Sequence, residues 1–262
     1  MTMGGSSSVP AATAALRVLR ALSAAPGPMT AAAVARTVDL PRSSTYHLLS
    51  VMAAEGFVVH LPEDRRWGLG VAAFEVGSAY LRHDPLERLA RPLLARLVDD
   101  VAPLAPAVGQ LGVLHGRELV YLLRETPRRP VTVVTDVGVR LPASLTASGL
   151  SLLAGLPAAQ VRALFPDAAA FLRRTDVGPG SPGELRRELA QVRRRGWAQE
   201  DGWVTDGYAS VAAAAHDHTG RPVAAFALTF RREAVDRDLR AELAAAAQSA
   251  AAALTARLTP RR

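Results

Sequence analysis

The chain has 262 residues, of which 49% are hydrophobic, enough for one large domain or for a small domain followed by a larger one. The formal net charge is +7, and every basic residue other than histidine is arginine. Guanidinium groups suit phosphates and guanine edges, so this balance mildly favours nucleic acid as a partner. The absence of cysteine excludes disulfides, thiolate metal sites and cysteine nucleophiles.

No targeting or membrane signal stands out. No apolar run reaches the roughly 18 residues that a membrane span needs. The first ten residues, MTMGGSSSVP, lack the charged start and apolar stretch of a signal peptide. We therefore expect a cytoplasmic protein without membrane contact, with a disordered tail over residues 1–10.

The first predicted helices lie in residues 11–38. Leu16, Leu19 and Leu22 fall on one side of a helix over 11–24, which Pro26-Gly27-Pro28 ends. Thr30 is a typical N-cap for a second helix that runs to about Val38.

A third helix, to about Glu55, carries the most informative pattern. Pro41 suits its first position and Gly56 its C-cap. Apolar spacing i, i+3, i+4 and i+7 marks its buried side, formed by Thr45, Leu48, Leu49 and Met52. Such a helix, just after another short one, is typical of a helix-turn-helix. The residues expected to contact DNA are Arg42, Ser43, Ser44, Tyr46 and His47.

A hairpin is predicted next. Phe57–His60 forms one strand, Pro62–Asp64 the turn and Arg65–Leu69 the return, so the hairpin is a wing. Arg65 and Arg66 would lie near its tip and reach phosphates or a minor groove. The alternative is a solvated pair of loop charges.

The run Gly68-Leu69-Gly70-Val71-Ala72-Ala73 matches a loose G-x-G-x-x-A dinucleotide pattern, but it follows a charged hairpin tip instead of a buried strand. We interpret 11–70 as a winged helix-turn-helix domain and 71–83 as a linker helix. Residues 84–262 mix helices and strands without strict alternation, which predicts an α+β domain with a largely antiparallel sheet. Helices are expected over 85–100, 144–153, 157–164, 184–195 and 236–258, and strands over 107–115, 119–124, 131–134, 197–200, 209–215 and 222–230.

These segments resemble the IclR family of bacterial transcriptional regulators over nearly the whole chain. The resemblance rests on the order of ALRVLRALSA, MTAAAVARTVDLPRSSTYHLLSVMAAEGFV, RRWGLGVAAFEVGSAY, GRELVYLLRETPRRPV, LPASLTASGLSLLAGLP and RRRGWAQEDGWVTDGYASVAAAAHDHTGRPVAAFALT. It implies an N-terminal winged helix-turn-helix and a C-terminal GAF-like α+β ligand-binding domain. It also implies homodimers, or tetramers built as dimers of dimers, that bind double-stranded DNA at pseudo-palindromic operators.

The resemblance also implies an effector site for a small, partly apolar organic acid. Ala147 and Ser148 would offer helix-start N–H groups to a carboxylate, and Tyr208 would stack on the ligand or close the pocket. Each position has an ordinary core or turn role as its alternative. The full set carried over is Pro130, Val133, Ala147, Ser148, Glu200, Tyr208, Ser210, Ala227 and Thr229.

The chain departs from the family pattern at several places. Family members often have Arg where this recognition helix has His47, which leaves base readout to Ser43, Tyr46 and His47 with Arg42 on phosphate. Leu150 replaces a Lys, and the usual Cys and Pro of another motif become Ser210 and Ala214.

Enzyme alternatives are weaker. His216-Asp217-His218 has a spacing that a strand can use for zinc, but Thr219-Gly220 makes it a hairpin end. Ser148 lacks the glycine of a G-x-S-x-G elbow, and neither H-E-x-x-H nor a P-loop occurs. We predict a ligand-responsive DNA-binding regulator with no cofactor, metal or catalytic residue. The main alternative is a small-molecule sensor with degenerate DNA binding that acts through protein contacts.

Overall fold

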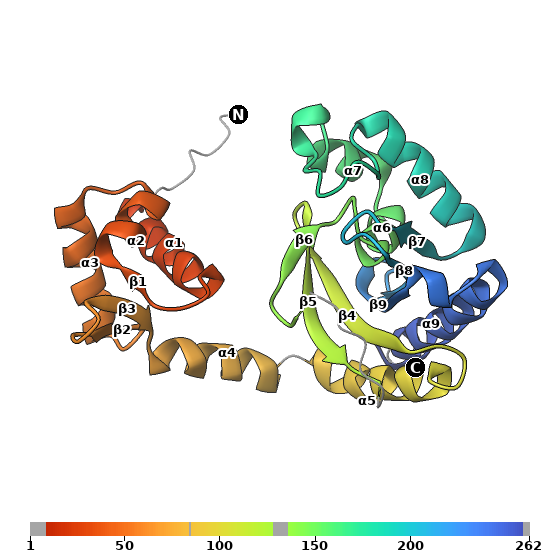
Figure 1. The fold of residues 1–262 in the computed structure, drawn as a ribbon, viewed down its shortest axis with the longest axis horizontal. Coiled ribbons are helices and arrows are strands. Elements are labelled where there is room, and N and C mark those ends of the chain that lie inside the picture. The colour runs from red at the N-terminus through yellow and green to blue at the C-terminus, as the bar shows by residue number, and fades with distance from the viewer. Residues whose placement is uncertain (1–8, 84, 128–135, 259–262) are drawn as a thin grey trace. The chain divides into compact units, whose positions relative to one another are not determined.

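The computed structural model describes residues 9–83, 85–127 and 136–258. They form two compact units that divide between Asp84 and Pro85, and each has its own core (Figure 1). The expected strand over 131–134 lies outside the described residues, as do the proposed ligand positions Pro130 and Val133.

The first unit is a small helical domain with a short sheet. Its helices bury one apolar cluster, in which Val18, Val34 and Leu49 are fully buried and Met52 and Trp67 nearly so. Thr45 is also fully buried, so the predicted apolar face of the third helix is confirmed. The elements are α1 (Pro10–Ala24), β1 (Met29–Thr30), α2 (Ala31–Val38), α3 (Arg42–Ala54), β2 (Val58–Leu61), β3 (Arg66–Leu69) and α4 (Val71–His83).

Local chemistry sets the ends of these helices. The Thr30 side chain accepts the Ala33 N–H at 3.2 Å, which confirms it as the cap of α2. Pro41 has ψ 144° and precedes the first turn of α3 instead of lying in it, so the predicted start was one residue early. Gly56 follows α3 with φ +74°.

A Cβ on Gly70 would lie 2.2 Å from the Gly56 carbonyl oxygen. Close backbone packing therefore accounts for the glycine at this position of the G-x-G-x-x-A pattern without a bound nucleotide.

The wing differs from its prediction in two ways. Its sheet has three strands in the order β1-β3-β2, because Met29 and Thr30 pair with Trp67 and Arg66. Arg66 therefore lies on β3, and its guanidinium donates to the Pro28 carbonyl at 2.8 Å. Of the two arginines expected at the tip, only Arg65 lies in the turn, where its φ is +51°.

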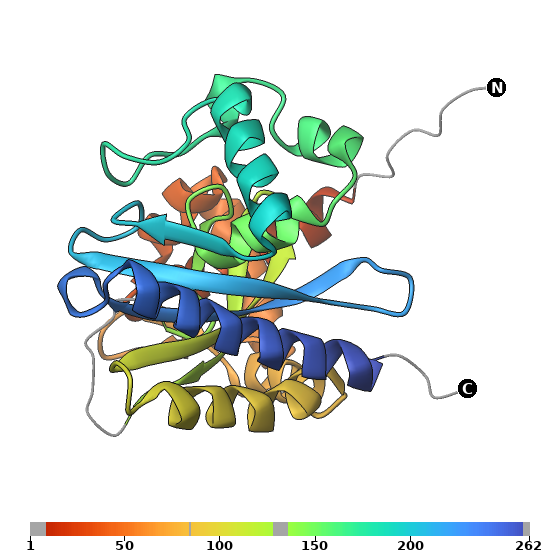
Figure 2. The ribbon, with the colours of Figure 1, turned by 90° about the vertical axis from the view of Figure 1, so that its right-hand side faces the viewer.

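The second unit is an α+β domain around one antiparallel sheet of strand order β6-β5-β4-β9-β8-β7. Two helices, α5 (Pro85–Val101) and α9 (Arg237–Leu258), cover one face of the sheet, and α6 (Ala147–Ala154) and α8 (Pro182–Arg195) cover the other (Figure 2). The remaining elements are β4 (Ala107–His115), β5 (Glu118–Glu125), β6 (Arg140–Pro142), α7 (Ala158–Leu164), η1 (Ala168–Ala170), β7 (Ala198–Asp201), β8 (Tyr208–His216), β9 (Pro222–Arg231) and η2 (Arg232–Ala234).

One expectation in this unit was wrong in detail, and one strand was not predicted. The helix expected from Ser144 begins at Ala147, because the Thr146 side chain caps it by accepting the Gly149 N–H at 3.0 Å. The preceding residues turn instead, with the Leu145 N–H bonded to the Pro142 carbonyl. The strand β6 is only three residues long, too short to show a strand pattern in the sequence. It pairs with β5 and forms an edge of the sheet.

Candidate functional site

The first candidate surface is the outer side of α3. Arg42, Ser43, Ser44 and His47 are exposed, and Tyr46 keeps 55% of its surface accessible although it is a large aromatic residue. The opposite side of the helix is held by the core, so this polar side is fixed in orientation. The fold thus presents the predicted DNA-contacting residues of α3 together, on one helix next to a wing.

The second candidate site is a pocket beside the sheet of the second unit. It has about 380 Å³ of free volume with its open mouth, but only about 20 Å³ of this can take the centre of a water molecule. Side chains from β4, β5, β6, β7, β8 and β9 meet there. The described residues that line it are Gln110, Tyr121, Leu141, Thr146, Glu200, Val204, Thr205, Tyr208, Ser210 and Thr229.

A row of four polar side chains crosses this pocket. Ser210 Oγ lies 2.7 Å from Glu200 Oε1 and 3.0 Å from Thr229 Oγ1, and Thr229 Oγ1 donates to Gln110 Oε1 at 3.1 Å. The Gln110 amide can turn either its oxygen or its NH2 group toward Thr229, so an ionised and a protonated Glu200 are both compatible with these contacts.

Burial favours the protonated form of Glu200. It raises the pKa of Glu200 to about 7, although hydrogen bonds from the Ser210 hydroxyl and the Trp203 N–H oppose the rise. Burial also raises the pKa of Tyr121 far above its usual range, which the neighbouring Ser148 hydroxyl partly offsets. Ser148 Oγ makes no well-aligned hydrogen bond within the described part of the chain. Near neutral pH the pocket thus holds a neutral Tyr121, and Glu200 gains or loses its proton close to this pH.

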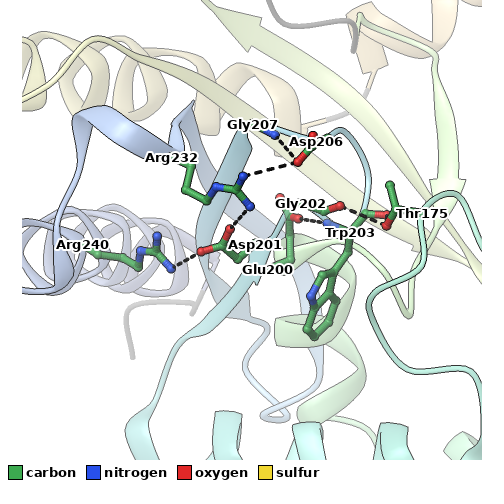
Figure 3. A network of polar contacts seen from close by, with 9 residues as sticks. All are labelled: Thr175, Glu200, Asp201, Gly202, Trp203, Asp206, Gly207, Arg232 and Arg240. Atoms are coloured by element: carbon green, nitrogen blue, oxygen red, sulfur yellow. Dashed lines mark hydrogen bonds and ion pairs between the residues drawn. The ribbon is translucent and has the colours of Figure 1, made fainter.

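The segment between β7 and β8 closes one side of the pocket and is tied down from two directions (Figure 3). Arg232 reaches both Asp201 and Asp206 at 3.4 Å, and Arg240 binds Asp201 at 3.0 Å. On the other side Thr175 Oγ1 donates to the backbone carbonyls of the segment, at 3.0 Å from Gly202 and 3.2 Å from Trp203. Gly202 and Gly207 at its ends have φ of +72° and +77°.

The structure brings only part of the expected effector set to the pocket. Glu200, Tyr208, Ser210 and Thr229 line it. Three further members, Ala147, Ser148 and Ala227, are buried beside it without lining it.

Sequence reasoning missed six lining residues. For Gln110 a signal existed, because it is a polar residue amid the apolar strand 107–115 and is 1% exposed. The other five gave no local signal as pocket residues; they are Tyr121, Leu141, Thr146, Val204 and Thr205.

The zinc alternative finds no support in the geometry. Asp217 accepts from the Thr219 N–H and hydroxyl and from the Arg221 N–H, so it organises the turn. Among the described residues, no three His, Asp or Glu side chains converge in a way that could hold a metal ion. None of the helices in those residues is long and apolar enough to cross a membrane.

Comparison with known families agrees with this architecture. Residues 11–62 match the IclR helix-turn-helix domain. Residues 78–256 match the bacterial transcriptional regulator IclR C-terminal domain. The chain belongs to the IclR family. It is accordingly a DNA-binding transcriptional regulator with an effector domain, in a family of regulators and not of enzymes.

Relatives cover almost the full length of this IclR-family regulator. The glycerol operon regulatory protein of Streptomyces coelicolor is 32% identical over 224 residues, which are 85% of each chain. The acetate operon repressor of Salmonella typhimurium is 28% identical over 251 residues, 93% of this chain and 88% of the relative.

Solved structures share the architecture. The Agobacterium tumefaciens repressor BlcR is 30% identical, with 98% of this chain and all of its own covered and a TM-score of 0.61. An IclR homologue from Microbacterium hydrocarbonoxydans, complexed with 4-hydroxybenzoate, has a TM-score of 0.78 at 24% identity. The match covers 95% of this chain and 98% of that homologue. At 24% identity, the likeness to this second structure shows the fold alone.

Proposed function

We propose that this regulator binds a pseudo-palindromic operator as a homodimer or a tetramer, in the cytoplasm, and represses transcription there. The observation that supports this is the exposed polar side of α3 on a helix fixed by its buried side. Ser43, Tyr46 and His47 would read base edges, while Arg42 and Arg65 would bind phosphates. A dimer would place two such helices about 34 Å apart, in successive major grooves.

Binding-site selection from random DNA tests this assignment. Wild-type protein should yield a palindromic consensus, and Tyr46→Phe or Ser43→Ala should change the preferred base at the positions that the residue contacts. Arg237→Ala, an exposed change in the second unit, is the matched control and should leave the consensus unaltered. An identical consensus for wild type and both α3 variants would contradict base readout by this helix.

The second candidate function is small-molecule sensing with degenerate DNA binding. The feature that favours it is His47 at a recognition-helix position where the family often has Arg. A gel shift with the DNA upstream of the protein's own gene separates the two. Retarded DNA supports the operator-binding function, whereas effector binding without any DNA shift supports the sensor.

We further propose that the effector is a small molecule whose hydroxyl groups, and not a carboxylate, face the Glu200 row. Among the described residues that line it, the pocket has one carboxyl group, Glu200, and no basic side chain. A carboxylate effector, which the sequence predicts, would place a second negative charge beside Glu200 without a cation from those residues to balance it. Hydroxyl groups can both donate and accept along the row of polar side chains.

The effector also needs more room than the closed pocket offers. Since only about 20 Å³ accepts a water centre, a wall of the pocket has to move for a molecule larger than water to enter, and we propose that the Gly202–Gly207 segment does so. One relative is named a glycerol operon regulatory protein, and a homologue of the same fold is complexed with 4-hydroxybenzoate, so an alcohol and an acid are both chosen as probes.

Matched alcohols and acids separate these classes. Glycerol is compared with glycerate, and 4-hydroxybenzyl alcohol with 4-hydroxybenzoate, by thermal shift at pH 8 and pH 6. Of the two alcohols, we expect the one that stabilises the protein more to raise the melting temperature more than its matched acid does at pH 8. The reason is that Glu200 is ionised at pH 8 and repels the carboxylate of the acid. The acids should gain on going to pH 6, and Glu200→Gln should remove that gain. An acid that stabilises wild type as well at pH 8 as at pH 6 would contradict the assigned effector class.

A further inference from the structure

A second cavity opens near the effector pocket, around the edge strand β6. Leu141 lines the effector pocket, whereas its neighbours Arg140 and Pro142 line this cleft. The cleft is far roomier, since about 530 Å³ can take the centre of a water molecule, against about 20 Å³ in the effector pocket. We call it the arginine cleft and define it by Arg117, Arg140, Ser144, Phe165, Arg173 and Arg174.

Positive charge dominates this cleft. Its lining includes four arginines but one carboxylate, Glu118, which binds Arg140 at 3.0 Å. The Arg117 side chain makes no hydrogen bond or ion pair with the described residues. Arg173 lies against the Gly180 backbone, and Arg174 Nε donates to the Val204 carbonyl at 3.4 Å. The cleft thus keeps an excess of guanidinium groups, unlike the effector pocket.

A buried hydroxyl in the cleft wall points to a polar ligand. Ser144 is 1% exposed, and its Oγ has no hydrogen-bond partner among the described residues. A buried hydroxyl without a partner is unfavourable, and native structures rarely leave one. Phe165, 2% exposed, adds an aromatic surface beside it.

We propose that the arginine cleft binds a small organic phosphate. A phosphate monoester carries about −1.5 to −2 charge near pH 7, which matches an excess of arginines better than a single carboxylate does. Planar guanidinium groups, with Arg117 the least engaged of them, bind phosphate oxygens in pairs. The Ser144 hydroxyl donates to a phosphate or ester oxygen, and the organic part lies on Phe165. This site is separate from the Glu200 row and does not depend on the effector assigned there.

Calorimetric titration of the full chain with phenyl phosphate tests this site. Wild type should bind phenyl phosphate at least tenfold more tightly than inorganic phosphate or phenol, because only the ester uses both the arginines and Phe165. Arg117→Ala and Ser144→Ala should each weaken binding by about tenfold, the usual effect of losing one charge-assisted hydrogen bond. Arg237→Ala removes an equal, exposed charge outside the cleft, and Glu200→Gln alters the effector pocket; both should bind as wild type does.

Three outcomes would overturn the proposal. If Arg237→Ala weakened binding as much as Arg117→Ala, the phosphate would be responding to the general positive charge of the surface. It would then be an adventitious ion only. Equal affinity for inorganic and phenyl phosphate would remove the role of the aromatic wall. A changed affinity in Glu200→Gln with the cleft variants unaffected would place the ligand in the effector pocket. Because Arg117 is exposed, its variant tests the site even if Ser144→Ala disturbs folding.

Discussion

Replacing Glu200 by glutamine should remove a pH dependence of stability that the wild-type protein carries. The wild-type carboxyl is 4% exposed and its pKa is raised from 4.5 to about 7, chiefly by burial. Glutamine keeps the shape of the side chain but has no proton to release in this range. The Ser210 hydroxyl, 2.7 Å from Glu200 Oε1 in the wild type, can still donate to an amide oxygen there.

The magnitude follows from the two pKa values. Between about pH 4.5 and about pH 7 the folded protein holds a proton on Glu200 that the unfolded chain has released. The free energy of unfolding therefore falls as the pH rises through this window, by roughly 3 kcal/mol in total for this group. Above about pH 7 the carboxyl is ionised in both states, and its contribution stays constant.

Urea unfolding of the full chain at pH 5, 6, 7 and 8 measures this effect. The free energy of unfolding of wild type minus that of Glu200→Gln should fall by about 2–3 kcal/mol from pH 5 to pH 8. Glu233→Gln, which removes an exposed carboxyl, is the control and should run parallel to wild type. Parallel curves for wild type and Glu200→Gln would refute the raised pKa of Glu200.

Three further predictions concern the fold and the wing. Arg65→Ala should weaken binding to all DNA sequences alike and lower the salt slope by about 1 in filter-binding titrations, and an unchanged slope would rule out a phosphate contact. Gly149→Ala would place a Cβ 2.1 Å from the Ala143 carbonyl oxygen. This variant should lower the free energy of unfolding in urea by more than about 2 kcal/mol. In the control Gly183→Ala the new Cβ would have no atom closer than 4.0 Å, so the free energy of unfolding should change by less than about 0.5 kcal/mol. Leu49→Ala, at a fully buried site, should destabilise the first unit by about 2–5 kcal/mol. Calorimetry should show a lowered transition for that unit with the other unchanged, and a shared shift would count against separate cores.

Local sequence alone was enough to predict most helices and several strands. The pattern of Thr45, Leu49 and Met52 predicted the buried side of α3 because helical periodicity is a property of neighbouring residues. The bounds of α4 and β4 agree with prediction for the same reason, and Thr30 was identified as a cap from its type and place. Glu200, Tyr208, Ser210 and Thr229 were reached through the family resemblance, which orders the motifs along the chain.

Tertiary structure decided what the sequence could not. Gln110 and Thr229 are hydrogen-bonded although 119 residues separate them, because β4 pairs with β9 in one sheet. The strand β1 exists only because the short Met29–Thr30 segment meets the edge of the wing, and that pairing draws Arg66 to Pro28 and away from the tip. The raised pKa of Glu200 likewise comes from burial among residues distant in sequence. A local pattern determines which face of an element is apolar, whereas contacts between distant segments determine what that face meets.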